Sequence, residues 1–297
     1  MEKKDKKAPE HFKITDGSKF SLADYPTEVR KKDIEKEEGE QLIQKDIEEL
    51  SALQDVLYAE NRHAVLIVIQ AMDAAGKDGT IKHIMSGVNP AGVKVSSFKS
   101  PSTAELNHDY FWRHYIALPG KGEIGIFNRS HYENVLVTKV HPEYILSEKH
   151  NHIKSLKDID KSFWKDRYKQ ICRFEKNLAE NDTLILKFFL HVSKDVQKKR
   201  FLDRIDDPSK NWKFSSADLK ERAFWDDYQS AYEDAIANTS TKSAPWYVIP
   251  ADEKWFTRYL IGNIICAELK KLDLKYPVIS DIERLALKKA KDALMNE

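Results

Sequence analysis

Runs of apolar residues alternate along the chain with segments whose apolar residues recur every three or four positions. The first run, residues 63–70, has six consecutive apolar residues and is typical of a strand buried at the centre of a parallel sheet. Strands that alternate with helices of crossover length predict an α/β fold with a parallel, doubly wound sheet. The predicted strands are 63–70, 94–98, 123–127, 183–190 and 246–250, and the predicted helices are one that begins at Thr80, then 105–116, 163–181, 194–205 and 216–238, and one from Trp255 to near the C-terminus.

The first 60 residues have a different pattern. Residues 1 to about 30 are polar, contain Pro9 and Pro26, and predict a tail that lies on the surface. Between 31 and 60, apolar residues recur at spacings of three, four or nine on a charged background, which predicts a long amphipathic helix. Its apolar face fits either its own domain or a second subunit. We expect this tail and helix at 1–60, a single core at 61–270 with a lid at about 194–225, and a C-terminal helix at 271–297.

The segment 71–80, Ala-Met-Asp-Ala-Ala-Gly-Lys-Asp-Gly-Thr, directly follows the first predicted strand and leads into a helix. A phosphate-binding loop needs glycine where the backbone wraps a phosphate, a lysine that reaches the phosphates, and a helix N-terminus behind it. The match to the nucleotide-binding pattern is incomplete, because Ala71 replaces its first glycine and Asp78 its hydroxyl residue. An incidental strand–turn–helix corner is the alternative interpretation. The residues predicted to bind phosphate are Ala75, Gly76, Lys77, Asp78, Gly79 and Thr80.

Asp73 places a carboxylate inside this loop. A carboxylate that faces bound phosphates repels them unless a cation lies between the two. Asp73 therefore predicts a divalent metal, most simply Mg²⁺, that bridges it to phosphate oxygens. The alternative is an aspartate that caps the following helix and is turned away from the ligand.

The strand at 123–127 is followed by Asn-Arg-Ser-His-Tyr-Glu. In P-loop enzymes an acidic residue at this strand end holds the metal or its water. Asn128 stands there instead and would position a ligand, Arg129 is suited to a phosphate or a developing negative charge, and Glu133 would supply a carboxylate. We interpret His131 as a structural residue. The predicted catalytic residues are Asp73, Lys77, Asn128, Arg129 and Glu133, with Asp73 and Glu133 as metal ligands.

A cluster of basic residues lies between Lys187 and Lys213, where eight basic residues accompany four acidic ones. Arg200 and Arg204 are four positions apart and share one helix face. A helix that carries arginines and is joined by a mobile loop can close as a lid over phosphates and exclude water. A solvated charged face is the alternative. We predict that Arg200, Arg204, Lys210 and Lys213 bind phosphate.

The overall composition limits the possible partners. The chain has 297 residues with 49 Lys and Arg against 48 Asp and Glu, a net charge of +1, which is not typical of nucleic-acid or membrane binders. The two cysteines, Cys172 and Cys266, lack the spacing of a disulfide framework or a zinc site. No apolar run approaches the ~18 residues of a membrane span, and the first residues do not resemble a signal peptide. We expect a cytoplasmic protein with no nucleic-acid or membrane partner.

Six segments together resemble the polyphosphate kinase 2 family. They occur in order from about residue 60 to 270, and an ordered match of this kind is more specific than any single motif. The N-terminal helix is also similar to the family pattern. The matching segments are 72–80, 86–90, 127–133, 191–194, 207–213 and 244–250.

The resemblance implies a P-loop kinase fold related to thymidylate kinase, a three-layer α/β/α arrangement with a helical lid. It also implies reversible phosphoryl transfer, with Mg²⁺, between inorganic polyphosphate and nucleotides. Asp73, Lys77 and Arg129 match the family's loop Asp, loop Lys and strand-end Arg, and Arg200 and Arg204 fall in its lid.

Many members of the family have Asp at the position of Asn128. The Asn-Arg-Ser-His-Tyr-Glu version is similar to the class III subgroup, which phosphorylates nucleoside mono- and diphosphates. The expected acceptors are therefore AMP, ADP, GMP and GDP. Because the long N-terminal helix is suited to self-association, we also expect a homo-oligomer.

Two other functions fit the same residues. An ATP-dependent nucleoside monophosphate kinase would use the same loop, although Asp78 at the hydroxyl position disfavours it. A non-catalytic polyphosphate-binding protein would explain the departures at Ala71 and Asn128.

Overall fold

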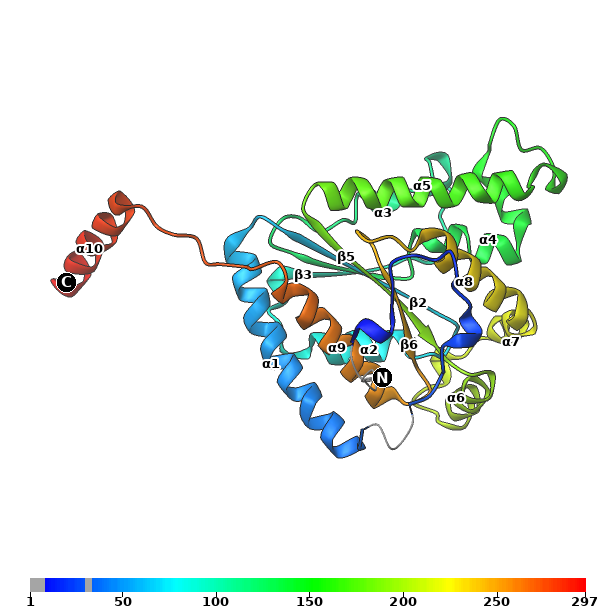
Figure 1. Ribbon diagram of the computed structural model, residues 1–297, viewed down its shortest axis with the longest axis horizontal. Helices are drawn as coiled ribbons and strands as arrows, with labels where there is room; N and C mark the ends of the chain where they lie inside the picture. The colour runs from blue at the N-terminus through cyan, green and yellow to red at the C-terminus, as the bar shows by residue number, and fades with distance from the viewer. Residues whose placement is uncertain (1–8, 30–33) are drawn as a thin grey trace.

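A six-stranded sheet with the strand order β1-β6-β5-β2-β4-β3 organises the protein (Figure 1). This computed structural model describes residues 9–29 and 34–297. Neighbouring strands are parallel except at one edge, where β1 runs antiparallel to β6. The strands are β1 (Lys13–Ile14), β2 (Ala64–Ala71), β3 (Val93–Ser97), β4 (Ile124–Asn128), β5 (Thr183–His191) and β6 (Trp246–Pro250).

The helices connect the strands and cover the sheet. The α-helices are α1 (Lys36–Glu60), α2 (Lys77–Ile84), α3 (Trp112–Tyr115), α4 (Val137–Val140), α5 (Lys161–Glu180), α6 (Lys194–Asp206), α7 (Ser216–Ala223), α8 (Trp225–Thr239), α9 (Lys254–Lys270) and α10 (Asp281–Met295). The short 3₁₀ helices are η1 (Pro9–His11), η2 (Leu22–Asp24), η3 (Met85–Gly87), η4 (Pro90–Gly92), η5 (Glu105–Asn107), η6 (His131–Asn134), η7 (Pro142–Glu148), η8 (Leu156–Asp158) and η9 (Asn211–Lys213). None of the helices in the described ranges is long and apolar enough to cross a membrane.

The prediction of an α/β fold is confirmed, and each of the five predicted strands is present within about one residue of its expected ends. Continuous apolar runs were a reliable signal because β2, β5 and β6 are buried along most of their length. The sheet is not wholly parallel, however. The antiparallel strand β1 was missed because it has only two residues and therefore no readable pattern.

Three predicted helices differ from the structure. The segment 105–116 forms only η5 and α3, because the Asp109 side chain accepts a hydrogen bond from the Phe111 amide and makes a turn between them. The helix predicted at 216–238 is interrupted at Phe224 and becomes α7 and α8. The C-terminal helix is also two helices. α9 ends at Lys270, and α10 begins only after Ser280, whose side chain forms a capping box with Glu283.

α1 packs lengthwise against α9, and this contact covers the apolar stripe of α1 (Figure 1). Ile43, Leu50 and Leu57 on this stripe are buried in the core of the same chain, so the described part of the stripe is not available to a second subunit. The predicted start of this helix at residue 31 lies outside the described residues. The division of the chain into residues 1–60, 61–270 and 271–297 stays a prediction.

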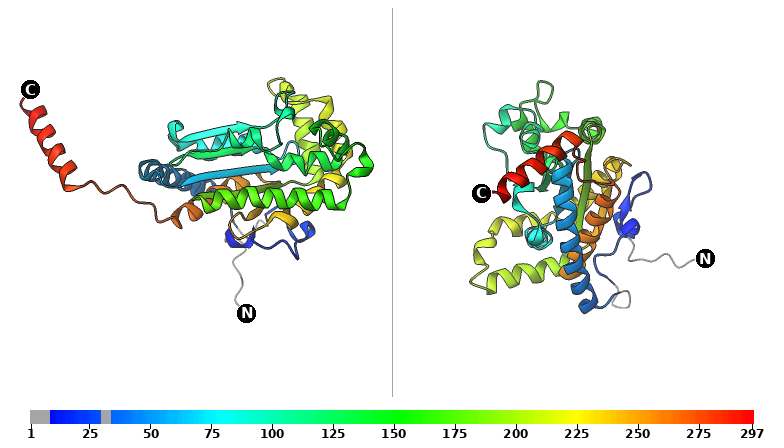
Figure 2. Two further views of the ribbon diagram at one scale, coloured as in Figure 1. Left: turned by 90° about the horizontal axis from the view of Figure 1, so that it is seen from above. Right: turned by 90° about the vertical axis from the view of Figure 1, so that its left-hand side faces the viewer.

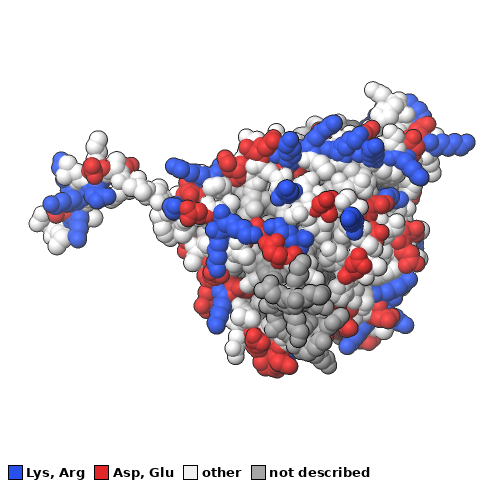
Figure 3. Space-filling model, viewed as in Figure 1, with Lys and Arg blue, Asp and Glu red and all other residues white. Residues whose placement is uncertain are grey.

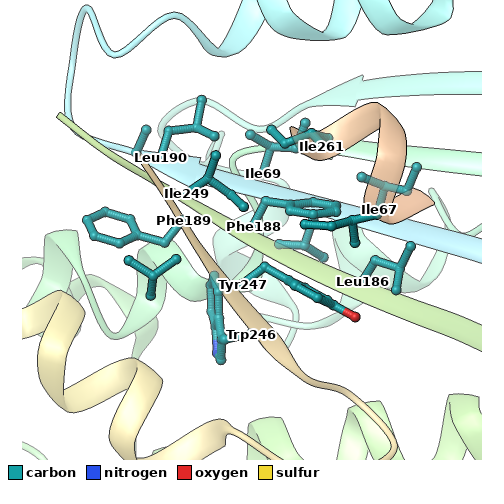
Figure 4. Close-up of a cluster of buried hydrophobic side chains, with 14 of the residues drawn as sticks. Ile67, Ile69, Leu186, Phe188, Phe189, Leu190, Trp246, Tyr247, Ile249 and Ile261 are labelled. Atoms are coloured by element: carbon teal, nitrogen blue, oxygen red, sulfur yellow. The ribbon is translucent and has the colours of Figure 1, made fainter. Parts of the chain in front are cut away.

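The core is centred on β2, β5 and β6. Figure 4 shows aliphatic side chains from β2 and β5 packed against Ile261 of α9 and against the aromatic side chains of β6. Trp246 and Tyr247 of β6 are fully buried, and the Tyr247 hydroxyl donates a hydrogen bond to Glu268 of α9. Lys, Arg, Asp and Glu are interspersed on the face drawn in Figure 3, as the near-neutral net charge leads one to expect.

Asp46 on α1 faces α9 with only 9% of its surface exposed, and burial raises its pKa to about 6. The folded protein therefore binds a proton at Asp46 more tightly than the unfolded chain, in which an aspartate pKa is about 4. Stability consequently falls as pH rises from about 4 to about 6. Asp46→Asn is expected to remove this loss, on the order of 2 kcal/mol in the free energy of unfolding. Urea unfolding at pH 4.5 and 7.5 measures it, with the exposed Asp55→Asn as control, and an unchanged pH slope in Asp46→Asn contradicts the prediction.

Candidate active site

The predicted site residues meet at the carboxyl end of the parallel strands. From β2 the chain passes to β3 and β4 on one side, and later to β5 and β6 on the other side. The loop after β2 therefore lies at the topological switch point of the sheet, where α/β proteins bind their ligands. The ends of β4 and β5 flank it, because both strands pair with β2.

The loop between β2 and α2 has the backbone that its sequence predicts. Gly76 precedes α2 with a φ of +108°, a left-handed conformation that a residue with a Cβ adopts only with strain. Ala74 also has a positive φ of 58°. Strained backbone of this kind is concentrated at functional sites. α2 starts at Lys77, so its first amides and the positive end of its dipole face the loop.

α6 fixes the loop through its carbonyl groups. The Nη1 atom of Arg200 donates hydrogen bonds to the carbonyl oxygens of Ala74 and Ala75 at 3.1 and 2.8 Å, and Gln197 Nε2 donates one to the carbonyl of Asp73 at 2.9 Å. Arg200 Nη2 donates to the carbonyls that follow β6, at Ala251 and Asp252. The carbonyls of the loop are thereby turned toward α6.

The prediction that Arg200 binds phosphate from a lid therefore needs correction. Its side chain is buried, and its terminal nitrogens are engaged with four backbone carbonyls. The sequence placed Arg200 and Arg204 on one face of α6, but only the packing of α6 against the loop shows that Arg200 supports the loop from behind. Gln197, which the sequence analysis did not single out, has the same supporting position.

Arg200→Met is expected to leave these buried carbonyls without donors. Each buried polar group that loses its partner costs about 1–3 kcal/mol, so we expect a loss of roughly 2–4 kcal/mol in the free energy of unfolding together with a less ordered loop. Arg204→Met on the same helix is the matched control, because within the described residues Arg204 makes a long hydrogen bond to the Lys213 carbonyl at 3.3 Å and lies 3.8 Å from Asp218, without a buried set of carbonyls to satisfy. Equal stability of the two variants in urea unfolding would show that Arg200 does not brace the loop.

Charged groups converge in front of the loop. Arg129 Nη2 donates to Asp73 Oδ1 at 3.1 Å, and the Arg129 backbone has a positive φ of 62°. Burial opposes the charge of Arg129, but Glu133 and Asp73 outweigh it and raise the pKa of Arg129. For Glu133 burial dominates and raises its pKa, although Arg129 and Lys77 lower it. Asp73, Arg129, Glu133 and Lys77 thus form one electrostatically coupled cluster.

Lys77 and Asn128 make specific contacts at the edge of this cluster. Lys77 Nζ donates to the carbonyl of Ala71 at 3.1 Å, and burial lowers the pKa of Lys77. Asn128 Nδ2 donates to Asp78 Oδ1 at 2.7 Å. Asn128 therefore links the end of β4 to the first turn of α2, which fits a positioning role. The Asp78 carboxylate is turned toward Asn128, and this contact accounts for an acidic residue where most P-loops have a hydroxyl.

A divalent metal fits the pair Asp73 and Glu133. Both carboxylates border the same cavity, and Mg²⁺ is commonly held by one or two carboxylates together with substrate phosphates and water. Arg129 and Lys77 already balance the charges of the two carboxylates. A cation would therefore enter together with the phosphates that it neutralises. Within residues 9–29 and 34–297, a closer group of three potential ligands, Asp46, Glu49 and Cys266, lies between α1 and α9, but Lys270 already pairs with Glu49 at 2.5 Å.

A buried polar network holds the segment that carries Arg129 and Glu133. Lys187 on β5 pairs with Glu175 on α5 at 2.6 Å and donates to the Tyr132 hydroxyl at 2.9 Å. Burial raises the pKa of Glu175, but Lys187 and His131 outweigh it, so the carboxylate stays charged. His131 lies 3.3 Å from Glu175 and is fully buried, as expected for a structural residue. The network anchors His131 and Tyr132 between the two functional side chains.

A cavity of about 570 Å³ adjoins the cluster. It reaches the loop at Ala71, Met72 and Asp73, whereas Gly76 and Lys77 are not among its lining residues. The wall away from the loop combines aromatic and basic side chains with the acidic ones of Glu105, Asp109, Glu148, Asp218 and Glu221. The sequence analysis missed these residues, although the i,i+4 spacing of the two tyrosines on α8 was a readable signal. The aromatic and basic residues missed in this way are Tyr110, Tyr144, Tyr228, Tyr232, Arg113 and Arg222.

The remaining predicted phosphate ligands are Arg204 in the last turn of α6 and Lys210 and Lys213 on the turn that follows it. Arg204 lies 3.8 Å from Asp218, Lys210 pairs with Asp207 at 2.6 Å, and the Lys213 ammonium lies over the ring of Trp212. None of the three lines the cavity. The ring of Trp212 is 79% exposed, so this turn presents its side chains to solvent.

A P-loop at the switch point of a mainly parallel sheet, beside an Arg–carboxylate cluster and a large cavity, defines an α/β enzyme of the P-loop kinase class. The Polyphosphate kinase 2 (PPK2) family model matches residues 33–277, and the chain belongs to this family. The predictions of the family, of the P-loop kinase fold and of a phosphotransferase are thereby confirmed. Enzymes that transfer phosphoryl groups generally use a divalent metal.

Individual relatives resemble the chain over most of its length. The ADP-polyphosphate phosphotransferase of Rhodopseudomonas palustris is 48% identical over 284 residues, which cover 96% of this chain and 97% of that protein. The AMP/ADP-polyphosphate phosphotransferase of Meiothermus ruber is 50% identical over 228 residues, which cover 77% and 80% of the two chains. The crystal structure of Polyphosphate Kinase 2 from Arthrobacter aurescens superimposes with a TM-score of 0.83 at 37% identity, covering 95% of this chain and 97% of that chain.

Proposed function

We propose that this protein transfers the terminal phosphoryl group of inorganic polyphosphate to AMP and ADP, with GMP and GDP as further acceptors and Mg²⁺ as the metal. The observation that carries the proposal is the position of the cavity. It meets the P-loop at Asp73 and the end of β4 at Arg129, so a phosphate chain on the loop and a second substrate in the cavity would meet at these two residues. The names of the Rhodopseudomonas and Meiothermus relatives support ADP and AMP as acceptors.

The wall of the cavity suits a nucleotide acceptor. Tyr228 and Tyr232 offer flat aromatic surfaces, and stacking of a base on such a surface contributes about 1–3 kcal/mol. Nη1 of Arg113 and Nη1 of Arg222 already donate hydrogen bonds within the protein, and the other N–H groups of these two guanidinium groups would bind the acceptor phosphates. A flat base and a short anionic tail would thus each find complementary groups.

The phosphate loop suits a donor that consists only of phosphates. Gly76 and the amides at the start of α2 would bind the bridging and terminal oxygens, with Ala75, Asp78, Gly79 and Thr80 completing the turn. Lys77 would neutralise charge on the phosphoryl group. Arg204 in the last turn of α6, with Lys210 and Lys213 on the exposed turn that follows, would hold the more distant phosphates of the chain.

The transfer itself depends mainly on positioning and charge. Phosphoryl transfer passes through a loose transition state whose negative charge spreads over the equatorial oxygens. Arg129 would stabilise this charge, and its own position is fixed by Asp73. Asp73 and Glu133 would hold Mg²⁺, which would supply positive charge to neutralise the substrate phosphates. Asn128 would keep α2 and the end of β4 in register through Asp78.

Product analysis with two donors and four acceptors tests the proposal. We expect polyphosphate with Mg²⁺ to convert AMP to ADP and then ATP, and GMP to GDP and then GTP. Product from ATP but not from polyphosphate would instead support an ATP-dependent nucleoside monophosphate kinase. Tight binding of polyphosphate without turnover of any acceptor would support the non-catalytic alternative.

The cellular setting stays a prediction. We propose a cytoplasmic enzyme that binds neither nucleic acid nor membranes, on the basis of its near-neutral charge. We also propose that it forms a homo-oligomer. We expected a self-association surface on α1. For the described part of this helix that expectation is wrong, since its apolar face packs against α9.

A further inference from the structure

The C-terminal arm, defined here as residues 276–297, stands away from the rest of the protein. Figures 1 and 2 show α10 at the end of an extended segment that leaves the molecule beyond α9. Every residue of the arm is exposed. The hydrogen bonds of α10 found within the described chain are made inside the arm, such as the capping box between Ser280 and Glu283.

α10 nevertheless has the pattern of a helix that packs on something. Ile282, Ala286, Ala290 and Leu294 follow one another at four-residue intervals and so share one face. An isolated helix of 15 residues is marginal in water, and most helical stability in proteins comes from packing an amphipathic face. The apolar face of α10 therefore implies a partner surface that its own core does not supply in this arrangement.

The extended segment before α10 adds to this surface. Tyr276 and Val278 are 62% and 92% exposed, and Ile282 at the start of the helix is 82% exposed. In total the arm exposes eight large apolar side chains. At roughly 60–120 Å² for each side chain, they offer on the order of 500–1,000 Å². This range includes the ~800 Å² that one partner contributes to a stable protein interface.

We propose that this arm docks on a second copy of this chain, which receives it while extending its own arm in return. Exchange of identical arms about a twofold axis buries both at once and needs no other molecule. A membrane is a poorer occupant, because helices that lie on anionic lipid have a strongly basic polar face, whereas α10 has four basic and three acidic residues. The family model ends at residue 277, two residues into the arm.

The arm makes the proposed homo-oligomer specific and is independent of the proposed phosphoryl transfer. A failure of either proposal can therefore be distinguished from a failure of the other. Transfer from polyphosphate is read from nucleotide products, whereas arm exchange is read from the mass of the particle in solution.

Sedimentation of the full chain and two matched double variants tests the arm. Ile282→Asp with Ala286→Asp places two carboxylates on the apolar face, and Lys288→Asp with Lys291→Asp places two on the opposite face. We expect the full chain and the Lys variant to sediment at a multiple of the 34.5 kDa chain mass, and the apolar-face variant at half that value or less. Circular dichroism checks that each variant is folded.

A full chain that is monomeric at micromolar concentrations would overturn the proposal, and so would equal masses for all three proteins. Deletion of residues 276–297 gives a second measurement that does not depend on the point variants, and it is expected to halve the mass as well. Hydrogen exchange of α10 completes the test. Strong protection of α10 in a monomeric particle would show that the arm folds back onto its own core, and protection only with lipid vesicles would show a membrane contact. Either result contradicts exchange between copies.

Discussion

Lys77→Ala is expected to lower the turnover of polyphosphate by at least about 10²–10³-fold, the loss seen when one preorganised donor to a developing charge is removed. Lys77 is the first residue of α2, and its ammonium lies within the coupled cluster of Asp73, Arg129 and Glu133. Without this charge, a phosphate at the start of α2 would face two carboxylates with only Arg129 to balance them.

The measurement is kcat with polyphosphate and ADP at saturating Mg²⁺. Lys82→Ala, an exposed lysine on the same helix, is the matched control and should keep nearly full activity. Circular dichroism and thermal unfolding separate a loss of chemistry from a loss of fold. Near-normal kcat in folded Lys77→Ala would show that the P-loop lysine does not contribute to phosphoryl transfer.

Asp73→Asn is the second large effect, because it removes a charge while it preserves the shape of the side chain. The substitution should abolish measurable turnover at millimolar Mg²⁺, since Asp73 both orients Arg129 and is the proposed metal ligand at the loop. Removal of metal from the native enzyme with a chelator should have the same effect and should be reversed by added Mg²⁺.

Metal titration separates the two roles of Asp73. If it holds the metal, the concentration of Mg²⁺ needed for any residual activity should rise strongly in Asp73→Asn, while it should stay unchanged in the exposed control Asp206→Asn. A variant with reduced kcat but the native dependence on Mg²⁺ would show that Asp73 only positions Arg129.

The parts of the protein that depend on local sequence were predicted well. The strand β2 and the turn at Gly76 follow from a buried apolar run and a glycine within 15 residues or so, whereas α2 begins at Lys77, three residues before the start predicted at Thr80. The sequence placed Asp73 and Arg129 after two strands of the sheet, and because parallel strands end at the same edge, the two side chains lie together in the structure. Both signals are present in the chain before it folds.

The parts that depend on packing between distant segments were not predictable. Arg200 and Arg204 carry the same charge and share one face of α6, yet Arg200 is buried behind the loop and Arg204 is not. Only the contact between α6 and residues 73–75 distinguishes them. Several segments that are far apart in sequence line the cavity, so no single segment predicts it.

The ends of the chain illustrate a further limit. An amphipathic pattern shows that a helix has a partner but not which one. The pattern of α1 left its own domain and a second subunit equally open, and the structure shows α9 of the same chain. α10 has a similar pattern, but none of its residues is buried. We therefore propose that its apolar face packs on a second copy of the chain.

The central claim is that polyphosphate donates the phosphoryl group to a nucleotide held beside Asp73 and Arg129. Incubation of the enzyme with radiolabelled polyphosphate, unlabelled AMP and Mg²⁺ tests it most directly. The account predicts that label appears first in ADP and then in ATP, and that folded Lys77→Ala transfers none. Label that stays in polyphosphate, while a parallel incubation with ATP in place of polyphosphate converts AMP to ADP, would contradict it.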